Sequence, residues 1–144
     1  MELIVTALAW INAFVFFVLA LIHFYWATGG KWGIEKAVPA TTTGEKVFKP
    51  SALASIVVGI GLSLMTIIHL SNAGLFSVDS QFPVSKITTL AIGIIFLLRS
   101  IGDFKWVGLF KKIKNTPFGH NDTSYFVPLC LFLSLSSFLI YCRA

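Results

Sequence analysis

Four long runs of apolar residues dominate the pattern of this chain. They extend over about residues 3–26, 52–76, 84–101 and 124–141, and polar segments separate them. A helix rises about 1.5 Å per residue and needs about 20 apolar residues to cross the roughly 30 Å hydrocarbon core of a bilayer. The pattern therefore predicts an all-α, four-helix transmembrane bundle, with residues 1–144 forming a single integral membrane domain.

The composition supports this prediction. Hydrophobic residues make up 56% of the chain and charged residues only 12%, whereas soluble domains average about 45–50% and roughly 25%. No polar stretch is long enough for a separate soluble catalytic module. The first apolar run follows Met1 and Glu2 without a basic residue and exceeds the usual signal-peptide core of about 7–15 residues, so we expect a retained span.

Lysines in two of the loops indicate the orientation of the bundle. The first and third loops contain Lys31, Lys36, Lys46, Lys49, Lys105, Lys111, Lys112 and Lys114, against Lys86 and Arg143 on the opposite side. The positive-inside rule places the lysine-rich loops in the cytoplasm and both termini outside. The net charge of +5 is then explained by topology and by attraction to anionic lipid headgroups, so the lipid bilayer is the expected partner and a nucleic acid is not.

The third loop also has a helical spacing of apolar residues. Trp106, Leu109, Phe110 and Ile113 recur at i, i+3, i+4 and i+7, with lysines between them. This spacing predicts a short amphipathic segment that lies in the headgroup layer as an interfacial anchor.

Small residues at intervals of four predict where helices pack against each other. They form two series, Ser51, Ser55, Gly59 and Ser63 in the second span, and Ser85, Thr89 and Gly93 in the third. Helices in lipid associate through such residues because these allow the backbones to approach closely.

Four ionisable residues fall at one expected depth, on the side of the lysine-rich loops. They are His23, Arg99, Asp103 and Asp122. A charge in the middle of a span costs about 2.5–3.5 kcal/mol on the insertion scale, so each such residue requires an explanation. These residues come from three segments that are distant in the sequence and are expected at one depth in the membrane, which is the main indication of a candidate site.

Each charged residue has a structural and a functional interpretation. Asp103 follows Arg99 by four residues, so it could neutralise Arg99 or a neighbour as a structural lock, or it could accept protons or contact a ligand. Arg99 could also extend to water. Asp122 precedes an apolar run within Asn121–Tyr125, where a helix N-cap is the simpler interpretation.

Aromatic residues and a histidine complete the candidate ligand-binding set. His23 shares a helical stripe with Trp26, and it is interpreted either as a hydrogen-bonded interior residue or as a group that transfers protons. Trp26 and Tyr125 fall at the expected interface, where they would belong to the aromatic belt or close the site. His69 lies at another depth, and no spacing motif indicates a metal site or any particular cofactor.

Three ordered motifs resemble a known family. They are Ile22–Trp26 followed by Gly29–Gly33, then Arg99–Phe104, then Asp122–Tyr125 with Pro128–Cys130. Together they resemble an uncharacterised family of small bacterial four-span membrane proteins, a domain of unknown function. The resemblance implies a four-helix fold in the bacterial cytoplasmic (inner) membrane, and it implies no reaction.

Three functions remain open at this stage. The first is a cytoplasm-facing polar pocket for a small anionic or lipid-like ligand, in which Arg99 binds the anionic group. The second is a non-enzymatic regulatory or immunity-type membrane subunit whose polar residues only lock the bundle. The third is a small proton-coupled transporter, which would need a homo-oligomer because four helices barely enclose a path. Whether the chain catalyses a reaction is not decided by the sequence.

Overall fold

Helices account for every regular element in the described part of the chain. The computed structural model describes residues 2–76 and 84–143, and within them no β-strand occurs. The four helical segments long and apolar enough to cross a membrane are α1 (Glu2–Ala27), α3 (Ala52–Asn72), α4 (Val84–Ile101) and a continuous segment over Pro117–Tyr141. The predicted all-α fold with four spans is thus confirmed.

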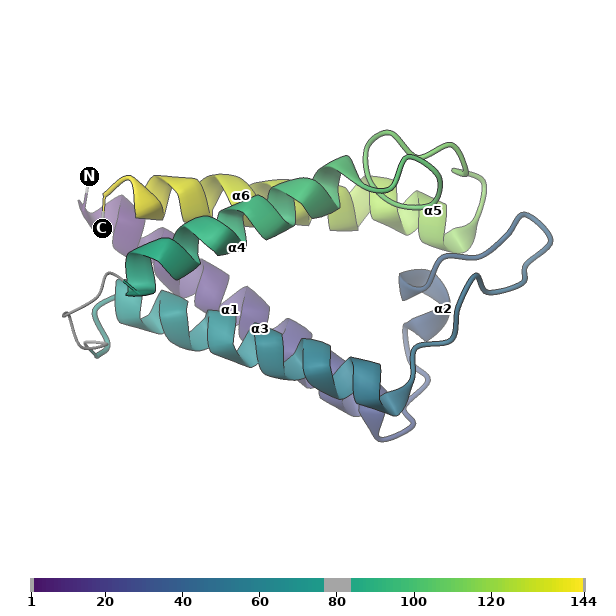
Figure 1. Cartoon of the computed structure of the whole chain (residues 1–144), viewed down its shortest axis with the longest axis horizontal. Helices are drawn as coiled ribbons and strands as arrows, with labels where there is room; N and C mark the ends of the chain where they lie inside the picture. Colours follow the sequence, from purple (N-terminus) through teal and green to yellow (C-terminus); the bar gives the residue numbers. More distant parts are fainter. Residues whose placement is uncertain (1, 77–83, 144) are drawn as a thin grey trace.

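The helices form two pairs that make a V. Helix α1 packs along α3, and α4 packs along α6 (Val127–Tyr141). Figure 1 shows the pairs close together at the end where α1 begins and α6 ends, and far apart at the opposite end. There the short helix α2 (Ile34–Ala37) lies between them and contacts α5 (Pro117–Asn121).

Small residues bring the helices of each pair together, as the spacing predicted. A Cβ atom added to Gly59 of α3 would lie 2.7 Å from the Phe24 ring of α1, and one added to Gly93 of α4 would lie 2.7 Å from the Phe138 ring of α6. The Ser134 hydroxyl also donates a hydrogen bond of 2.8 Å to the Gly93 carbonyl. Between the pairs lies an apolar core of Phe16, Ala20, Leu62, Ile92 and Leu133.

Buried polar side chains connect the two pairs where they converge. The Ser136 hydroxyl lies 2.9 Å from Asn12 Oδ1, and the Ser137 hydroxyl lies 3.3 Å from Nε2 of His69. Asn72 of α3 donates to the Thr89 hydroxyl of α4 at 2.7 Å. These contacts fix the narrow end of the V, because a polar group in an apolar surrounding is costly when it is unpaired.

The glycine of the α1–α3 contact provides a test of this packing. We expect Gly59→Leu to lower the thermal stability of the protein in detergent by about 1–3 kcal/mol, because its side chain would displace the Phe24 ring. Gly61→Leu, two residues along the same helix, is the matched control, since a Cβ there meets nothing within 4 Å. Equal stability of the two variants would contradict the close approach of α1 and α3.

The fourth helical segment begins earlier than predicted. It starts at Pro117 rather than near residue 124, and Thr116 caps it by accepting a hydrogen bond of 2.9 Å from the Gly119 N–H. Its middle part, η1 (Asp122–Phe126), is a π-helical turn in which the Val127 N–H bonds to the Asp122 carbonyl. Pro128 explains this turn, because it has no N–H to continue the α-helical pattern and its ring crowds the preceding turn.

Candidate functional site

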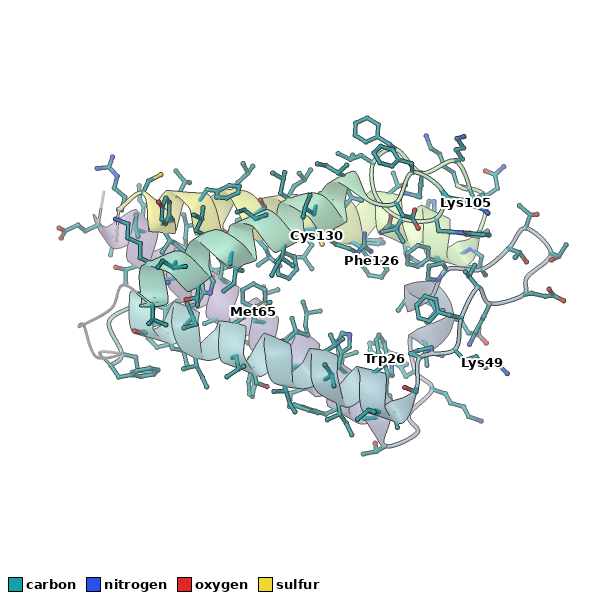
Figure 2. The ribbon with its side chains drawn as sticks, in the orientation of Figure 1. Trp26, Lys49, Met65, Lys105, Phe126 and Cys130 are labelled. Carbon is teal, nitrogen blue, oxygen red and sulfur yellow. The ribbon has the colours of Figure 1, made fainter. Side chains whose placement is uncertain are left out.

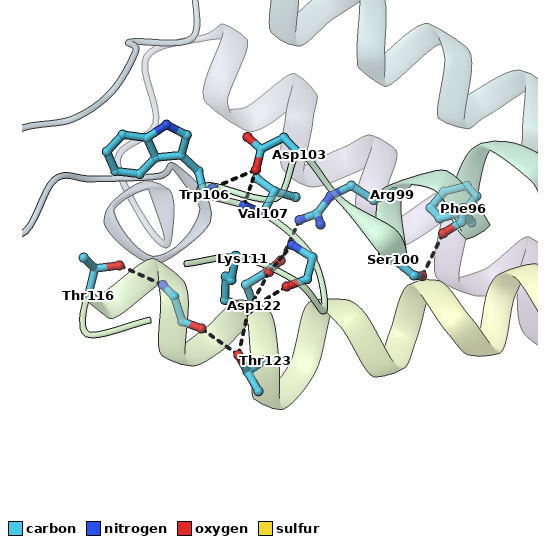
Figure 3. Close-up of polar contacts among 12 residues, drawn as sticks. Phe96, Arg99, Ser100, Asp103, Trp106, Val107, Lys111, Thr116, Asp122 and Thr123 are labelled. Carbon is cyan, nitrogen blue, oxygen red and sulfur yellow. Dashed lines mark hydrogen bonds and ion pairs between the residues drawn. The ribbon is translucent and has the colours of Figure 1, made fainter. Parts of the chain in front are cut away.

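A fully buried carboxylate, Asp122, is the centre of an ionic cluster at the wide end of the V. Its Oδ1 accepts a hydrogen bond of 2.8 Å from Nη2 of Arg99 in α4. Its Oδ2 lies 3.0 Å from Nζ of Lys111 and accepts a hydrogen bond of 2.8 Å from the Gly108 N–H. Figure 3 shows these groups surrounding Asp122. Two cations therefore share one carboxylate, and the cluster ties α4 and the following loop to the fourth segment.

Lys111 is buried although it belongs to a loop. Its side chain is 1% exposed, and its ammonium group donates to the Gly108 carbonyl at 3.0 Å and to the Thr123 hydroxyl at 2.7 Å, besides facing Asp122. An ammonium group has three N–H donors, and each has a partner here. Lys111 is thus an internal part of the cluster rather than a solvated surface charge.

Two glycines allow the loop after α4 to fold tightly over Asp122. Gly102 and Gly108 both have positive φ, +85° and +90°. Their backbones pass so close to each other that a Cβ on either residue would collide with backbone atoms on the opposite side of the loop. The Leu109 N–H bonds to the Ser100 carbonyl at 2.8 Å and closes the loop. Only glycine combines this conformation with this approach.

Asp103 stabilises the same loop and does not pair with Arg99. Its Oδ1 accepts hydrogen bonds of 3.0, 2.7 and 2.9 Å from the N–H groups of Lys105, Trp106 and Val107. The interpretation of Asp103 as the partner of Arg99 is therefore wrong, because Arg99 reaches Asp122 instead. The helical spacing of Trp106–Ile113 also does not produce a helix, since this segment consists of turns and bends.

The hydrogen bonds of Asp103 make the loop sensitive to acid. Slight burial acts to raise the pKa of Asp103, but the three backbone N–H groups outweigh it and hold the pKa below the ordinary value of 3.8. A lowered pKa means that the carboxylate stabilises the loop at neutral pH and that this stabilisation is lost as the pH falls below 3.8. We expect Asp103→Ala at neutral pH to increase amide hydrogen exchange at residues 105–107, and wild-type exchange there would contradict this role.

Asp122 is not the helix N-cap that its sequence context favoured. The helix is already formed at this position, because α5 and η1 are continuous and Thr116 is the cap. The acid lies inside the helical segment, with its side chain turned to the interior. The residues that precede an apolar run can thus belong to a longer, partly polar helix.

A cavity of about 520 Å³ lies beside the cluster, among α1, α2, α5 and η1. It is lined by Leu19, Ile22, His23, Trp26, Lys31, Trp32, Gly33, Glu35, Lys36, Ala37, Asn121 and Phe126. We call it the α2 cavity. Trp26 and Phe126, which are labelled in Figure 2, border the space between the helix pairs from opposite sides.

Two α1 side chains form the wall that divides the α2 cavity from a neighbouring one. His23 and Trp26 also line a second cavity of about 380 Å³, between α1, α3 and the loop that leads to α3. The Trp26 indole donates to the Trp32 carbonyl at 2.9 Å, and His23 Nδ1 bonds to the Leu19 carbonyl at 2.8 Å. A carbonyl only accepts, so Nδ1 of His23 carries the proton and Nε2 is the nitrogen that a ligand could meet.

Five of the six predicted site residues lie in three places, and Tyr125 lies apart from them. His23 and Trp26 line the α2 cavity, Arg99 and Asp122 meet in the ionic cluster, and Asp103 organises the loop. Tyr125 is 65% exposed and lines neither cavity.

The predicted site did not include Lys111 or most of the residues that line the α2 cavity. Lys111 belongs to the cluster, and Lys31, Lys36 and Phe126 line the α2 cavity. Phe126 follows Asp122 by about one helical turn, which could have indicated it. Nothing in the pattern distinguished Lys111 from the other loop lysines.

Comparison with protein families identifies the group to which this sequence is related. The family model described as "Protein of unknown function (DUF3995)" matches residues 16–137, a range that contains the ionic cluster and the whole α2 cavity. The chain belongs to this family. The DUF3995 match confirms the resemblance to a domain of unknown function. Comparison with curated proteins and with solved structures found no match.

The described residues of this DUF3995 protein show what chemistry the site can perform. Within residues 2–76 and 84–143, no group of three His, Cys, Asp or Glu side chains is placed to hold a metal ion. The cluster provides a buried carboxylate shared by two cations, with Nη1 of Arg99 buried without a hydrogen-bond partner among the described residues, while the α2 cavity provides apolar and cationic side chains around a partly open volume. Of the two, the cavity is the one that leaves space for another molecule.

Proposed function

We propose that this multi-pass membrane protein binds an amphiphile with an anionic headgroup in the α2 cavity. The observation that carries the proposal is a cavity of about 520 Å³ with apolar side chains from the spanning helix α1 and lysines from the loop and α2. Together with the lysine-rich loops, it favours a site at the cytoplasmic face of a bacterial inner membrane.

The apolar part of the cavity suits a hydrocarbon chain. Leu19, Ile22 and Trp26 lie on successive turns of α1, and Phe126 faces them from η1. These side chains belong to helices that cross the bilayer, so a lipid-like ligand could enter from the leaflet without passing through water. Each buried methylene group of such a chain contributes about 0.8 kcal/mol.

The polar part of the cavity suits a phosphate or carboxylate group. Lys31 and Lys36 lie at its border, and Glu35 is the one carboxylate among the lining residues. Cations outnumber acids there, which favours an anionic ligand. His23 Nε2 could accept a hydrogen bond from a hydroxyl of the headgroup, or donate one when the ring is protonated.

The ionic cluster supports the α2 cavity by positioning residues that line it. Asp122 and Lys111 have their hydrogen-bonding groups directed at each other and at the loop, so neither is free to hold a ligand. By tying α4 and the loop to η1, the cluster places Asn121 and Phe126 at the cavity. We assign Asp122 a structural role and Arg99 the same role through its Nη2, in contrast to the anion-binding role that the sequence suggested for Arg99; the Nη1 of Arg99 is buried without a hydrogen-bond partner in the part of the chain that the structure describes.

Native mass spectrometry can test the proposal. The protein would be released from nanodiscs that contain equal amounts of phosphatidylglycerol and phosphatidylcholine. We expect the wild type to retain one anionic lipid, and Lys31→Gln/Lys36→Gln to lose most of it because the cavity then has no lysine. The same spectra report whether the chain is a monomer or a homo-oligomer.

The matched control removes the same charge elsewhere on the same side. Lys46→Gln/Lys114→Gln changes two lysines that do not line the α2 cavity, and it should retain lipid as the wild type does. Equal retention in all three proteins, or no selective retention in the wild type, would contradict the proposal and favour a non-enzymatic subunit without a ligand.

A further inference from the structure

The loop after α4 presents two stacked aromatic rings at its surface. Phe104 and Phe110 are 58% and 60% exposed, and their ring centroids lie 6.1 Å apart at an interplanar angle of 26°. Leu109, next to Phe110, is 48% exposed. We call Phe104, Leu109 and Phe110 the loop tip.

Phe104 is held in a backbone conformation that bulky residues rarely adopt. Its φ is 63°, and it is the one non-glycine residue with positive φ in the described part of the chain. The turn is fixed on both sides, by Gly102 and by the hydrogen bonds to Asp103. Glycine would occupy this position without strain. A phenyl ring nevertheless occupies this strained position, and the ring is stacked and exposed. This indicates that the Phe104 ring contacts something outside the chain.

The loop tip lies where a membrane surface would be. Phe104 follows the last residue of the spanning helix α4, Ile101, by three positions. Figure 1 shows the loop arching away from the bundle at this end of α4, beside the helices rather than over the opening of the V. Apolar side chains in this place would reach the acyl chains next to α4.

Cations surround the loop tip on its polar side. Lys105, Lys112 and Lys114 are exposed, whereas Lys111 is turned inward to Asp122. Phe104, Lys105, Lys112 and Ile113 border a surface hollow of about 450 Å³, to which Asp103 also contributes. The Nζ of Lys105 lies 5.1 Å from the centre of the Trp106 ring. Aromatic rings with lysines at their border are typical of segments that lie in an anionic headgroup layer.

We propose that the loop tip docks into the bilayer leaflet that borders the end of α4, with Lys105 and Lys112 on the phosphates of anionic phospholipids. The partner is the phospholipid surface itself, because apolar rings, lysines and the end of a spanning helix occur together. The ionic cluster holds the loop in one conformation and thereby keeps the loop tip exposed. This contact is separate from the α2 cavity, whose lining residues it does not share.

A nitroxide spin label can report the surroundings of the loop tip in the full-length protein. Leu109→Cys would be labelled in a Cys142→Ser background, since Cys130 is buried and Cys142 is exposed. The protein would be placed in vesicles of phosphatidylcholine and phosphatidylglycerol, and collisions with oxygen, which dissolves in lipid, compared with collisions with a water-soluble nickel chelate. We expect oxygen collisions to exceed nickel collisions several-fold at residue 109 and the reverse for a label at Thr42, an exposed position of the first loop.

Two variants separate docking from a purely structural loop. Phe104→Gly should reduce the oxygen preference at residue 109 and leave thermal stability in detergent unchanged or higher, because it removes the ring and the strain together. Lys105→Gln/Lys112→Gln should reduce the preference in vesicles with phosphatidylglycerol and have little effect in pure phosphatidylcholine.

The other results would overturn the proposal. A label at residue 109 that collides mainly with the nickel chelate would show a loop in water. A label protected from both reagents would show a protein contact, such as a second copy of the chain. Neither result bears on the α2 cavity, which the lipid-retention experiment tests separately.

Discussion

Asp122→Ala should be the most destabilising single substitution in this protein. It removes the one carboxylate that faces Lys111 within the described residues, leaves a lysine side chain that is 1% exposed, and also releases Arg99 and the Gly108 N–H. Removing one partner of a buried ion pair costs about 3–5 kcal/mol, because the remaining charge stays buried without compensation. Thermal unfolding of the purified protein in detergent measures the effect. A loss of stability below about 1 kcal/mol would contradict the structural role of the ionic cluster.

A triple substitution tests whether the cluster acts through charge compensation. Arg99→Leu/Lys111→Met/Asp122→Ala removes both cations together with the acid, and Leu and Met keep volumes similar to those of Arg and Lys. Replacing a whole buried ionic group by apolar residues is often neutral, so we expect it to recover most of the stability lost in Asp122→Ala. It should also retain the lipid that we propose for the α2 cavity, and loss of that lipid with full stability would show that Arg99 or Asp122 binds the ligand.

Gly102→Ala should have the second largest effect. A Cβ at this position collides with the Val107 carbonyl, and φ is +85°. The left-handed conformation alone costs a non-glycine residue about 1–2 kcal/mol, and the collision prevents the loop from closing over Asp122. We expect lower thermal stability and faster hydrogen exchange of the Leu109 amide, which bonds to the Ser100 carbonyl in the closed loop.

Gly44→Ala is the matched control for backbone strain. Gly44 has a similar φ of +87°, but a Cβ there meets nothing within 4 Å. Its substitution should cost only the strain of the left-handed conformation. If the two variants lose equal stability, the close approach of the Gly102 and Gly108 backbones does not contribute to the stability of the protein.

The membrane helices were predictable because hydropathy depends on local sequence. The third span was placed at residues 84–101, and α4 extends over Val84–Ile101. The fourth was placed seven residues too late, since Pro117–Thr123 forms a polar helical turn that hydropathy does not detect. The π-helical turn at Asp122–Phe126 follows from Pro128, which the sequence showed within the span but whose effect depends on the surrounding helix.

The site was only partly predictable because its contacts join distant segments. The depth of Arg99 and Asp122 indicated that they could meet, and they do. Their connection to Lys111 depends on the path of a loop with two glycines at positive φ, which periodicity cannot describe. The segment Trp106–Ile113 has the spacing of an amphipathic helix but consists of turns and bends, and Asp103 accepts hydrogen bonds from the N–H groups at its start.

The α2 cavity depends on features that no single stretch of sequence contains. His23 and Trp26 were correctly placed together on α1. The opposite wall comes from η1 and the outer border from α2, so the cavity exists only because the helix pairs diverge. The two pairs are joined by polar contacts at the narrow end, such as that between His69 and Ser137.

Photo-crosslinking from inside the α2 cavity tests the central claim most directly. The photoreactive residue benzoylphenylalanine would replace Phe126, which lines the cavity, or Leu135 as a control, which is 60% exposed on α6. After irradiation in native membranes, we expect position 126 to capture one anionic amphiphile, and Lys31→Gln/Lys36→Gln to abolish that product. Position 135 should capture the bulk lipid mixture. If position 126 captures the same mixture as position 135, or nothing, the α2 cavity is not a ligand site.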